Sequence, residues 1–130
     1  MGYALSATVK HPFASTLDAT RAALADQGFG VLTEIDLATT LKTKIDADIP
    51  AHVILGACRP PLAYAAVQAE PSIGLLLPCN VVVRAIDDGT TLVEAMDPQV
   101  MVTLTGNDAL AGVATDARER LTAALAVIAA

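Results

Sequence analysis

Two cysteines and their immediate neighbours are the residues of this chain whose types and positions could support chemistry. Cys58 ends the apolar run "HVILGAC" and is followed by Arg59, and Cys79 stands between Pro78 and Asn80 in "GLLLPCNVVV". A thiol acts as a nucleophile or as a soft-metal ligand when it ionises to the thiolate. Cys58, Cys79, Asn80 and Arg59 are therefore the candidate ligand-binding residues.

Cys58 has the stronger argument for reactivity. Pro60 and Pro61 suit the first positions of a helix, so Cys58 lies just ahead of a predicted helix N-terminus. The positive end of the helix dipole stabilises a thiolate there, and the guanidinium of Arg59 acts in the same direction. Free cysteines are also among the most buried residue types, so packing is the competing interpretation for Cys58 and the stronger one for Cys79.

Whether the two thiols meet depends on how their strands pair. If the strand that ends at Cys58 and the strand that begins near Cys79 are parallel, the sulfurs lie at opposite ends of the sheet. If the strands are antiparallel, the sulfurs lie at the same end. The helix predicted between them favours the parallel case, but the long return segment "EPSIGLLLP" leaves both arrangements open.

Asn80 is a polar residue at the head of the valine run "VVV". A buried amide must find hydrogen-bond partners, because an unpaired one is costly. We therefore expect Asn80 to face a ligand or to cap a neighbouring loop.

Other kinds of site have weak support. His11 and His52 stand in no CxxC or HxxxH spacing, so we assign no metal site, and the carboxylates around residues 87–97 are typical of a solvated turn. Neither GxGxxG nor GxxxxGK[ST] occurs, so no nucleotide loop is predicted. No nucleophile and base are suitably spaced, so the sequence identifies no cofactor and leaves open whether the chain is an enzyme.

Composition limits the partners and the compartment. The chain has 130 residues, 54% hydrophobic and 3% aromatic, with a formal net charge of −6, and we expect one domain over residues 1–130. The acidic balance argues against binding to nucleic acid or to an anionic membrane surface. Since no long apolar run or signal pattern is present, we expect a cytoplasmic protein with free thiols.

The predicted strands and helices alternate along the chain up to a final β-hairpin, which one more helix follows. Strands are expected over residues 2–9, 30–37, 52–58, 80–87 and 90–97, and Asp88 with Gly89 predicts the hairpin turn between the last two. Helices are expected before Gly28, after an Asp36 cap, after Pro60 and after an Asn107 cap. The order β-α-β-α-β-α-β-β-α indicates an α+β fold with its helices mostly on one face of the sheet.

Three segments carry a resemblance to a known family. "GFGVLTEIDLATTLKTKI", "VILGACRPPLAYAAVQAEPSIGLLLPCNVVV" and "MDP" resemble the DUF302 family of small prokaryotic domains, over residues 28–97. The resemblance implies a curved, mainly antiparallel sheet packed by helices, similar to one half of a TATA-binding protein, and a homodimer. It supplies no reaction, and the family commonly has Asn at the position of Arg59.

Two hypotheses for function follow. The first is a cytoplasmic homodimer that binds a small ligand, a sulfur species or a soft metal at a site lined by Cys58, Cys79 and Asn80, with Arg59 beside it. The second is a structural or protein-interaction module in which both cysteines are packing residues. Thiols that face one accessible pocket favour the first hypothesis, and inert thiols with an exposed apolar surface favour the second.

Overall fold

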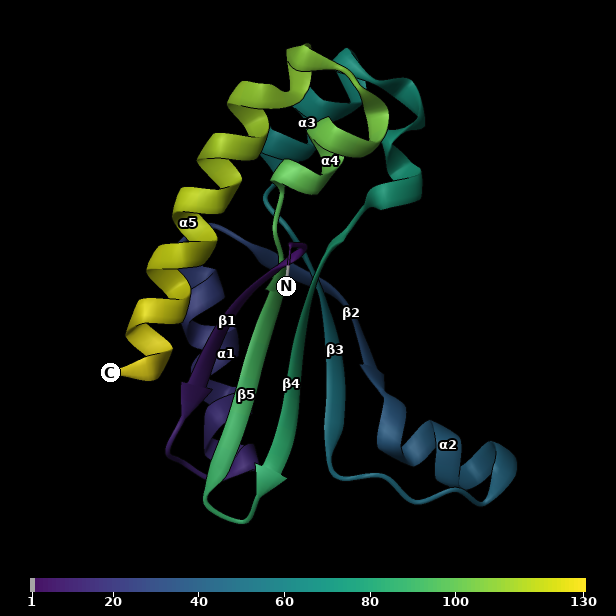
Figure 1. Cartoon of the computed structure of the whole chain (residues 1–130), viewed down its shortest axis with the longest axis vertical. Coiled ribbons are helices and arrows are strands. Elements are labelled where there is room, and N and C mark those ends of the chain that lie inside the picture. The colour runs from purple at the N-terminus through teal and green to yellow at the C-terminus, as the bar shows by residue number, and fades with distance from the viewer. Residues whose placement is uncertain (1) are drawn as a thin grey trace.

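The sheet is open and antiparallel throughout. The computed structural model describes residues 2–130. The spatial order of the strands is β1 (Ala4–Val9), β5 (Thr90–Met96), β4 (Cys79–Asp87), β3 (His52–Cys58) and β2 (Gly30–Asp36) (Figure 1). Every neighbouring pair is antiparallel. The predicted α+β fold and element order are confirmed, and β1 and β2 are the two edges.

Two helices cover one face of the sheet. Helix α1 (Phe13–Asp26) and helix α5 (Ala111–Ala129) pack against the sheet, as expected for helices on one face (Figure 1). Helix α1 ends as predicted, with Gly28 at a positive φ of 82°. The core contains these buried residues of the central strands and of the two helices: Ala23, Leu24, Val53, Leu55, Ala57, Val81, Val83, Val93, Ala95, Leu121, Ala124, Leu125 and Ile128.

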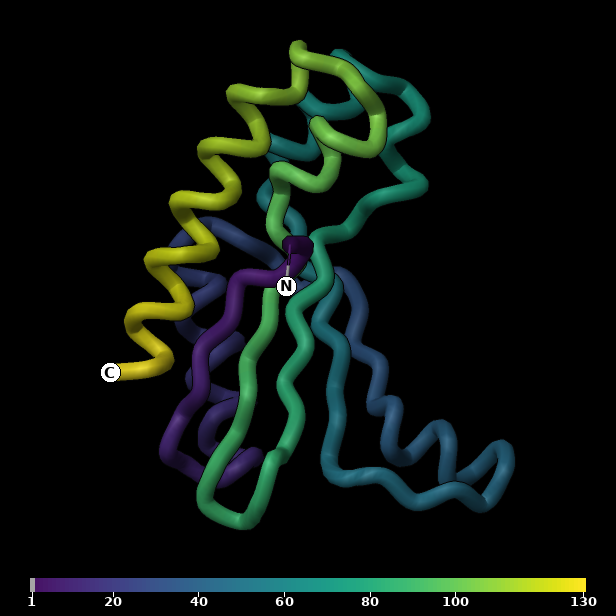
Figure 2. The backbone as a smooth tube through the Cα atoms, in the orientation of Figure 1, coloured from purple at the N-terminus to yellow at the C-terminus, as the bar shows by residue number. Residues whose placement is uncertain are grey.

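A helical lobe stands beyond one end of the sheet. It consists of α3 (Pro60–Ala69), the 3₁₀ helix η1 (Pro71–Leu76), α4 (Gln99–Thr105) and the 3₁₀ turn η2 (Asp108–Leu110), which leads into α5 (Figure 2). The lobe has its own core, built on Ala66, Ile73, Met101 and Leu110. Asn107, which we predicted to cap the last helix, instead caps η2, because its side chain accepts a hydrogen bond from the Ala109 N–H, and Leu110 precedes α5 without a side-chain cap.

Helix α4 was not predicted. Its sequence "QVMVTLT" is rich in β-branched residues, which lower helix propensity. Asp97 accepts a hydrogen bond from the Gln99 N–H and so supports the first turn, and Met101 is buried in the lobe. Tertiary packing therefore forms a helix that local propensity does not indicate.

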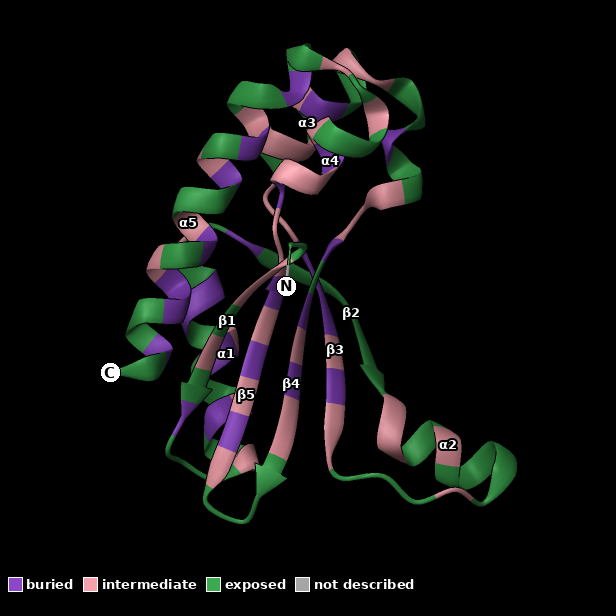
Figure 3. Ribbon diagram, in the orientation of Figure 1, coloured by how far each residue is buried: buried purple, intermediate pink, exposed green. Residues whose placement is uncertain are grey.

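Strand β2 and helix α2 (Leu37–Ile45) extend away from the core. Asp36 caps α2 as predicted, by accepting a hydrogen bond from the Thr39 N–H. All of β2 is exposed and α2 contains no buried residue (Figure 3). Helix α2 therefore contributes no residue to either core.

Candidate functional site

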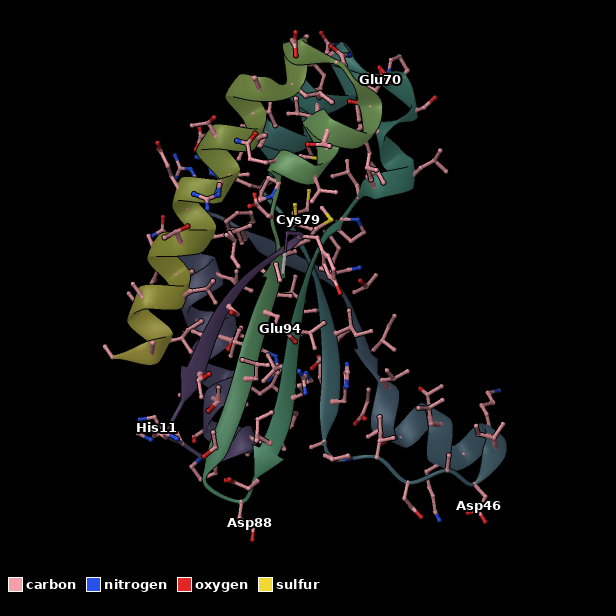
Figure 4. All side chains as sticks on the ribbon, in the orientation of Figure 1. His11, Asp46, Glu70, Cys79, Asp88 and Glu94 are labelled. Atoms are coloured by element: carbon pink, nitrogen blue, oxygen red, sulfur yellow. The ribbon has the colours of Figure 1, made fainter. Side chains whose placement is uncertain are left out.

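The antiparallel alternative places both cysteines at the same end of the sheet. Ala57 of β3 pairs with Cys79 of β4, so Cys58 is one residue beyond that pair. Successive strand residues point to opposite faces, so Cys79 shares its face with Ala57 rather than with Cys58. Both are free thiols, and they form no disulfide. Figure 4 shows Cys79 where the sheet meets the helical lobe.

A small cavity lies at this junction. Its volume is about 20 Å³. That is room for one water-sized group, far below the size of a pocket for an organic molecule. The lining is mostly apolar and comes from the sheet, the lobe and α5: Phe29, Ala57, Cys58, Arg59, Leu62, Ala63, Ala66, Leu77, Cys79, Met101, Val113 and Ala117. Both cysteines and Arg59 thus border one cavity.

Cys79 is held as a neutral thiol. Burial raises the pKa of its thiol from 9.0 to about 11, and the charge of Cys58 acts in the same direction. Thiolate is the nucleophilic form, so Cys79 has little reactivity at neutral pH. Cys58 is half-buried, so it is the more accessible of the two thiols.

Arg59 borders the cavity and has an unpaired buried donor. Its Nε is buried and has no hydrogen-bond partner within residues 2–130. The side chain packs over the backbone of Gly28, where a Cβ would lie 3.1 Å from that Nε. A buried donor without a partner is destabilising, and functional sites are among the places where such groups persist. The absence of a side chain at Gly28 therefore admits the guanidinium to this position.

The start of α3 offers no free backbone donors. Pro60 and Pro61 have no N–H, and the N–H groups of Leu62 and Ala63 both donate to the carbonyl oxygen of Arg59. An anion at this end of α3 would therefore interact with the helix dipole and with Arg59, rather than with a cradle of N–H groups.

Asn80 lies on the other face of the sheet. It is exposed, so its amide needs no protein partner, unlike the buried amide that we expected from the valine run. It borders a separate hollow together with Arg84 and Glu94. The cavity at the lobe therefore contains three of the four candidate residues.

The remaining candidate chemistry is sparse in the described part of the chain. Within residues 2–130, no group of three or more His, Cys, Asp or Glu is placed to hold a metal ion. Asp87 belongs to the predicted hairpin turn, where hydrogen bonds led by the Gly89 N–H lower the pKa of its carboxyl group. No helix in the same range is long and apolar enough to cross a membrane.

The sequence interpretation missed the ion pair between Arg84 and Glu94. The Arg84 Nε donates to Glu94 Oε1 at 3.1 Å across the β4–β5 hairpin. A signal was present, because the Asp88 and Gly89 turn indicates the hairpin register and places these two charges on the same face.

Comparison with known proteins identifies the family. The model of the family described as "Domain of unknown function DUF302" matches residues 5–128. A solved structure of an uncharacterized conserved DUF302 protein from Bacillus stearothermophilus is similar over 98% of each chain, with 28% sequence identity and a TM-score of 0.89. No curated protein matches the chain. The match over nearly all of the chain shows that this protein belongs to the DUF302 family.

Proposed function

We propose that this protein binds a small anionic sulfur species at the cavity lined by Cys58, Arg59 and Cys79. The observation that supports this proposal is that Cys58, Cys79 and Arg59, whose buried Nε has no partner within residues 2–130, all border one cavity. The volume of about 20 Å³ limits the occupant to about one heavy atom. Hydrosulfide is the simplest species of that size and charge.

The charge of Arg59 favours an anion over a soft metal cation. A guanidinium beside the cavity attracts an anion and repels a cation, and the apolar surroundings strengthen both effects. Burial also keeps Cys79 protonated, whereas a soft metal requires thiolate ligands. Free thiols are typical of a reducing compartment, which supports the cytoplasm as the location that we propose.

The test is a titration followed by backbone amide NMR under anaerobic conditions. Sodium hydrosulfide is the probe, sodium chloride is the control for anion charge, and Cu(I) tests the soft-metal alternative. We expect hydrosulfide alone to give saturable shifts at Phe29, Cys58 and Cys79. Arg59→Gln should abolish this saturation, whereas Arg120→Gln, which removes the charge of an ion-paired arginine on α5, should preserve it.

Each result separates the alternatives. Equal shifts with chloride would show that hydrosulfide acts only through ionic strength. Stoichiometric binding of Cu(I) with no response to hydrosulfide would show that the cavity binds a soft metal rather than an anion. If neither probe shifts the cavity residues, the proposal fails and both cysteines are packing residues.

A second candidate function is an interaction module that forms a homodimer. Strand β2 is an unpaired edge with no buried residue, and its side chains Val31, Leu32 and Ile35 are 39%, 66% and 47% exposed. Ile45 at the end of α2 is 69% exposed. A long exposed apolar edge strand is a template for pairing with another chain, and pairing with β2 of a second copy would satisfy its backbone groups and bury these side chains.

The dimer is tested by sedimentation velocity across a concentration series. We expect a homodimer whose dissociation constant rises in Leu32→Glu. Leu104→Glu introduces the same charge at a leucine that is 67% exposed on α4 and serves as the matched control. A wild-type chain that remains monomeric at the highest concentration, or variants that behave alike, would rule out β2 as the interface.

A further inference from the structure

The face of the sheet opposite α1 and α5 contains an isolated polar cluster. Along β4 and β5, alternate side chains point away from the helices, and these include Asn80, Arg84 and Glu94. Figure 4 shows Glu94 midway along the sheet, well separated from Cys79 at the lobe. This cluster is therefore distinct from the cavity of the proposed function.

Arg84 and Glu94 are hydrogen-bonded to each other, but each has further hydrogen-bonding groups that are unused. Arg84 Nε donates to Glu94 Oε1, and the side chain of Glu94 is only 17% exposed. Within residues 2–130, the two terminal nitrogens of Arg84 and the second carboxylate oxygen of Glu94 have no side-chain hydrogen bond. A fixed cation and a fixed anion thus stand side by side, each with free capacity.

The surrounding hollow has the size and composition of a ligand site. Its volume is about 340 Å³, and it is lined by Tyr3, Ala4, Asn80, Val82, Arg84, Glu94, Ala95 and Met96. Pockets for small molecules combine an apolar surface with a few placed polar groups at about this volume. The lining combines the polar side chains of Asn80, Arg84 and Glu94 with the apolar side chains of Ala4, Val82 and Met96.

Tyr3 completes the rim of the hollow. Its side chain is 60% exposed, but its backbone is fixed because its carbonyl oxygen accepts a hydrogen bond from the Asp97 N–H. An aromatic ring that borders a partly apolar hollow can pack against a ring or a branched apolar group.

We propose that this hollow binds a small zwitterion, an α-amino acid with an apolar side chain. The carboxylate of such a ligand would accept hydrogen bonds from the terminal nitrogens of Arg84, in the bidentate geometry that guanidinium groups favour. Its ammonium group would donate to the free oxygen of Glu94, and Asn80 would supply a further polar contact. The apolar side chain would lie on Val82 and Met96 beneath Tyr3.

The pairing of charges selects this class of ligand. A simple anion would meet the Glu94 carboxylate, and a simple cation would meet the Arg84 guanidinium, so each would lose part of its attraction to the like charge. In an α-amino acid the two charges are separated by one carbon atom, which matches two side chains already joined by a hydrogen bond. A neutral polar molecule could hydrogen-bond to both side chains but would gain no ion-pair attraction from either.

Amide NMR of the full chain tests the proposal with L-phenylalanine as the probe. We expect saturable shifts, with a millimolar dissociation constant, that are confined to Tyr3, Asn80, Arg84, Glu94 and their neighbours. The comparison compounds are 3-phenylpropanoate, which lacks the ammonium group, and phenylalaninamide, which lacks the carboxylate. Each should bind about tenfold more weakly or worse, because each leaves one charge of the pair without its partner.

A double variant keeps the test independent of folding. Arg84→Gln combined with Glu94→Gln removes both charges and retains two amides that can bond to each other, so no buried charge is left unpaired. We expect this variant to lose binding, whereas Asp116→Asn combined with Arg120→Gln, which neutralises an ion pair on α5, should bind normally. Unchanged binding in the first variant, equal binding of 3-phenylpropanoate, or an absence of saturation at this hollow would overturn the proposal.

Discussion

Thr33 of β2 packs its side chain onto the backbone of Gly56, its partner in the register of β3. A Cβ at Gly56 would collide with Thr33 Oγ1 and would lie 2.8 Å from Cγ of Pro78. The glycine of "ILGAC" therefore lets a neighbouring strand and the Pro78 loop approach β3 closely, next to the residues that line the cavity.

Gly56→Ala should destabilise the protein by about 2–3 kcal/mol, because the added methyl group must displace Thr33 and Pro78 in a packed region. Urea unfolding followed by circular dichroism measures the change. Gly112→Ala is the matched control, because a Cβ there meets open space in helix α5. That substitution should raise stability by about 0.5–1 kcal/mol. Equal effects of the two substitutions would contradict this account of Gly56.

Alkylation of the native protein by iodoacetamide at neutral pH should modify Cys58 before Cys79. Cys58 is half-buried, whereas Cys79 is buried with a pKa of about 11. We expect one adduct by intact mass and a second one only after denaturation. Cys58→Ser should remove the first adduct, and Cys79→Ser should leave it. A native adduct that peptide mapping assigns to Cys79 would contradict the burial of this thiol.

The Cys79 thiol should make stability depend on pH in the alkaline range. It ionises near pH 9.0 in the unfolded chain and near pH 11 in the folded protein, so between these values the unfolded state releases a proton that the folded state keeps. The stabilisation is complete below pH 9 and is lost as the pH rises to 11, a change of about 2–3 kcal/mol. Thermal unfolding at several pH values should show this decline in Cys58→Ala but not in Cys79→Ala. If the stability of both variants declined equally with pH, the raised pKa would not belong to Cys79.

Local signals in the sequence predict most of the elements. The Asp88 and Gly89 turn, the stop at Gly28 and the cap at Asp36 each act through neighbouring residues, and all three are present in the structure. Helix α4 depends instead on the burial of Met101 in the lobe, so its local composition gave no sufficient signal.

The candidate site was less accessible to sequence reasoning. The face on which Asn80 lies follows from the pairing of β4 with both neighbours, which a single strand does not determine. The burial of the Arg59 Nε depends on Gly28, 31 positions away in the chain. The sequence indicated which residues lie at the end of the sheet that borders the cavity, but it did not indicate which face of the sheet each of them occupies.

Asn107 joins the two ends of the helical lobe, and its replacement should loosen the lobe over the cavity. Its Nδ2 donates to the carbonyl oxygen of Ala69 at 3.0 Å and to Glu70 Oε1 at 3.1 Å, and its Oδ1 accepts from the Ala109 N–H at 2.9 Å. Asn107→Ala removes all three bonds, and we expect a loss of about 2–3 kcal/mol in thermal unfolding.

The effect of Asn107 should separate into two parts. Asn107→Ser keeps a cap for η2 but is too short to reach Ala69, so it should lose about half as much stability as Asn107→Ala. Thr103→Ala, at an exposed position on α4, should change stability by less than about 0.5 kcal/mol. Because α3, α4 and α5 supply Ala66, Met101 and Val113 to the cavity, Asn107→Ala should also speed the alkylation of Cys79. A large loss of stability with no change in the reactivity of Cys79 would show that the lobe does not control access to the cavity.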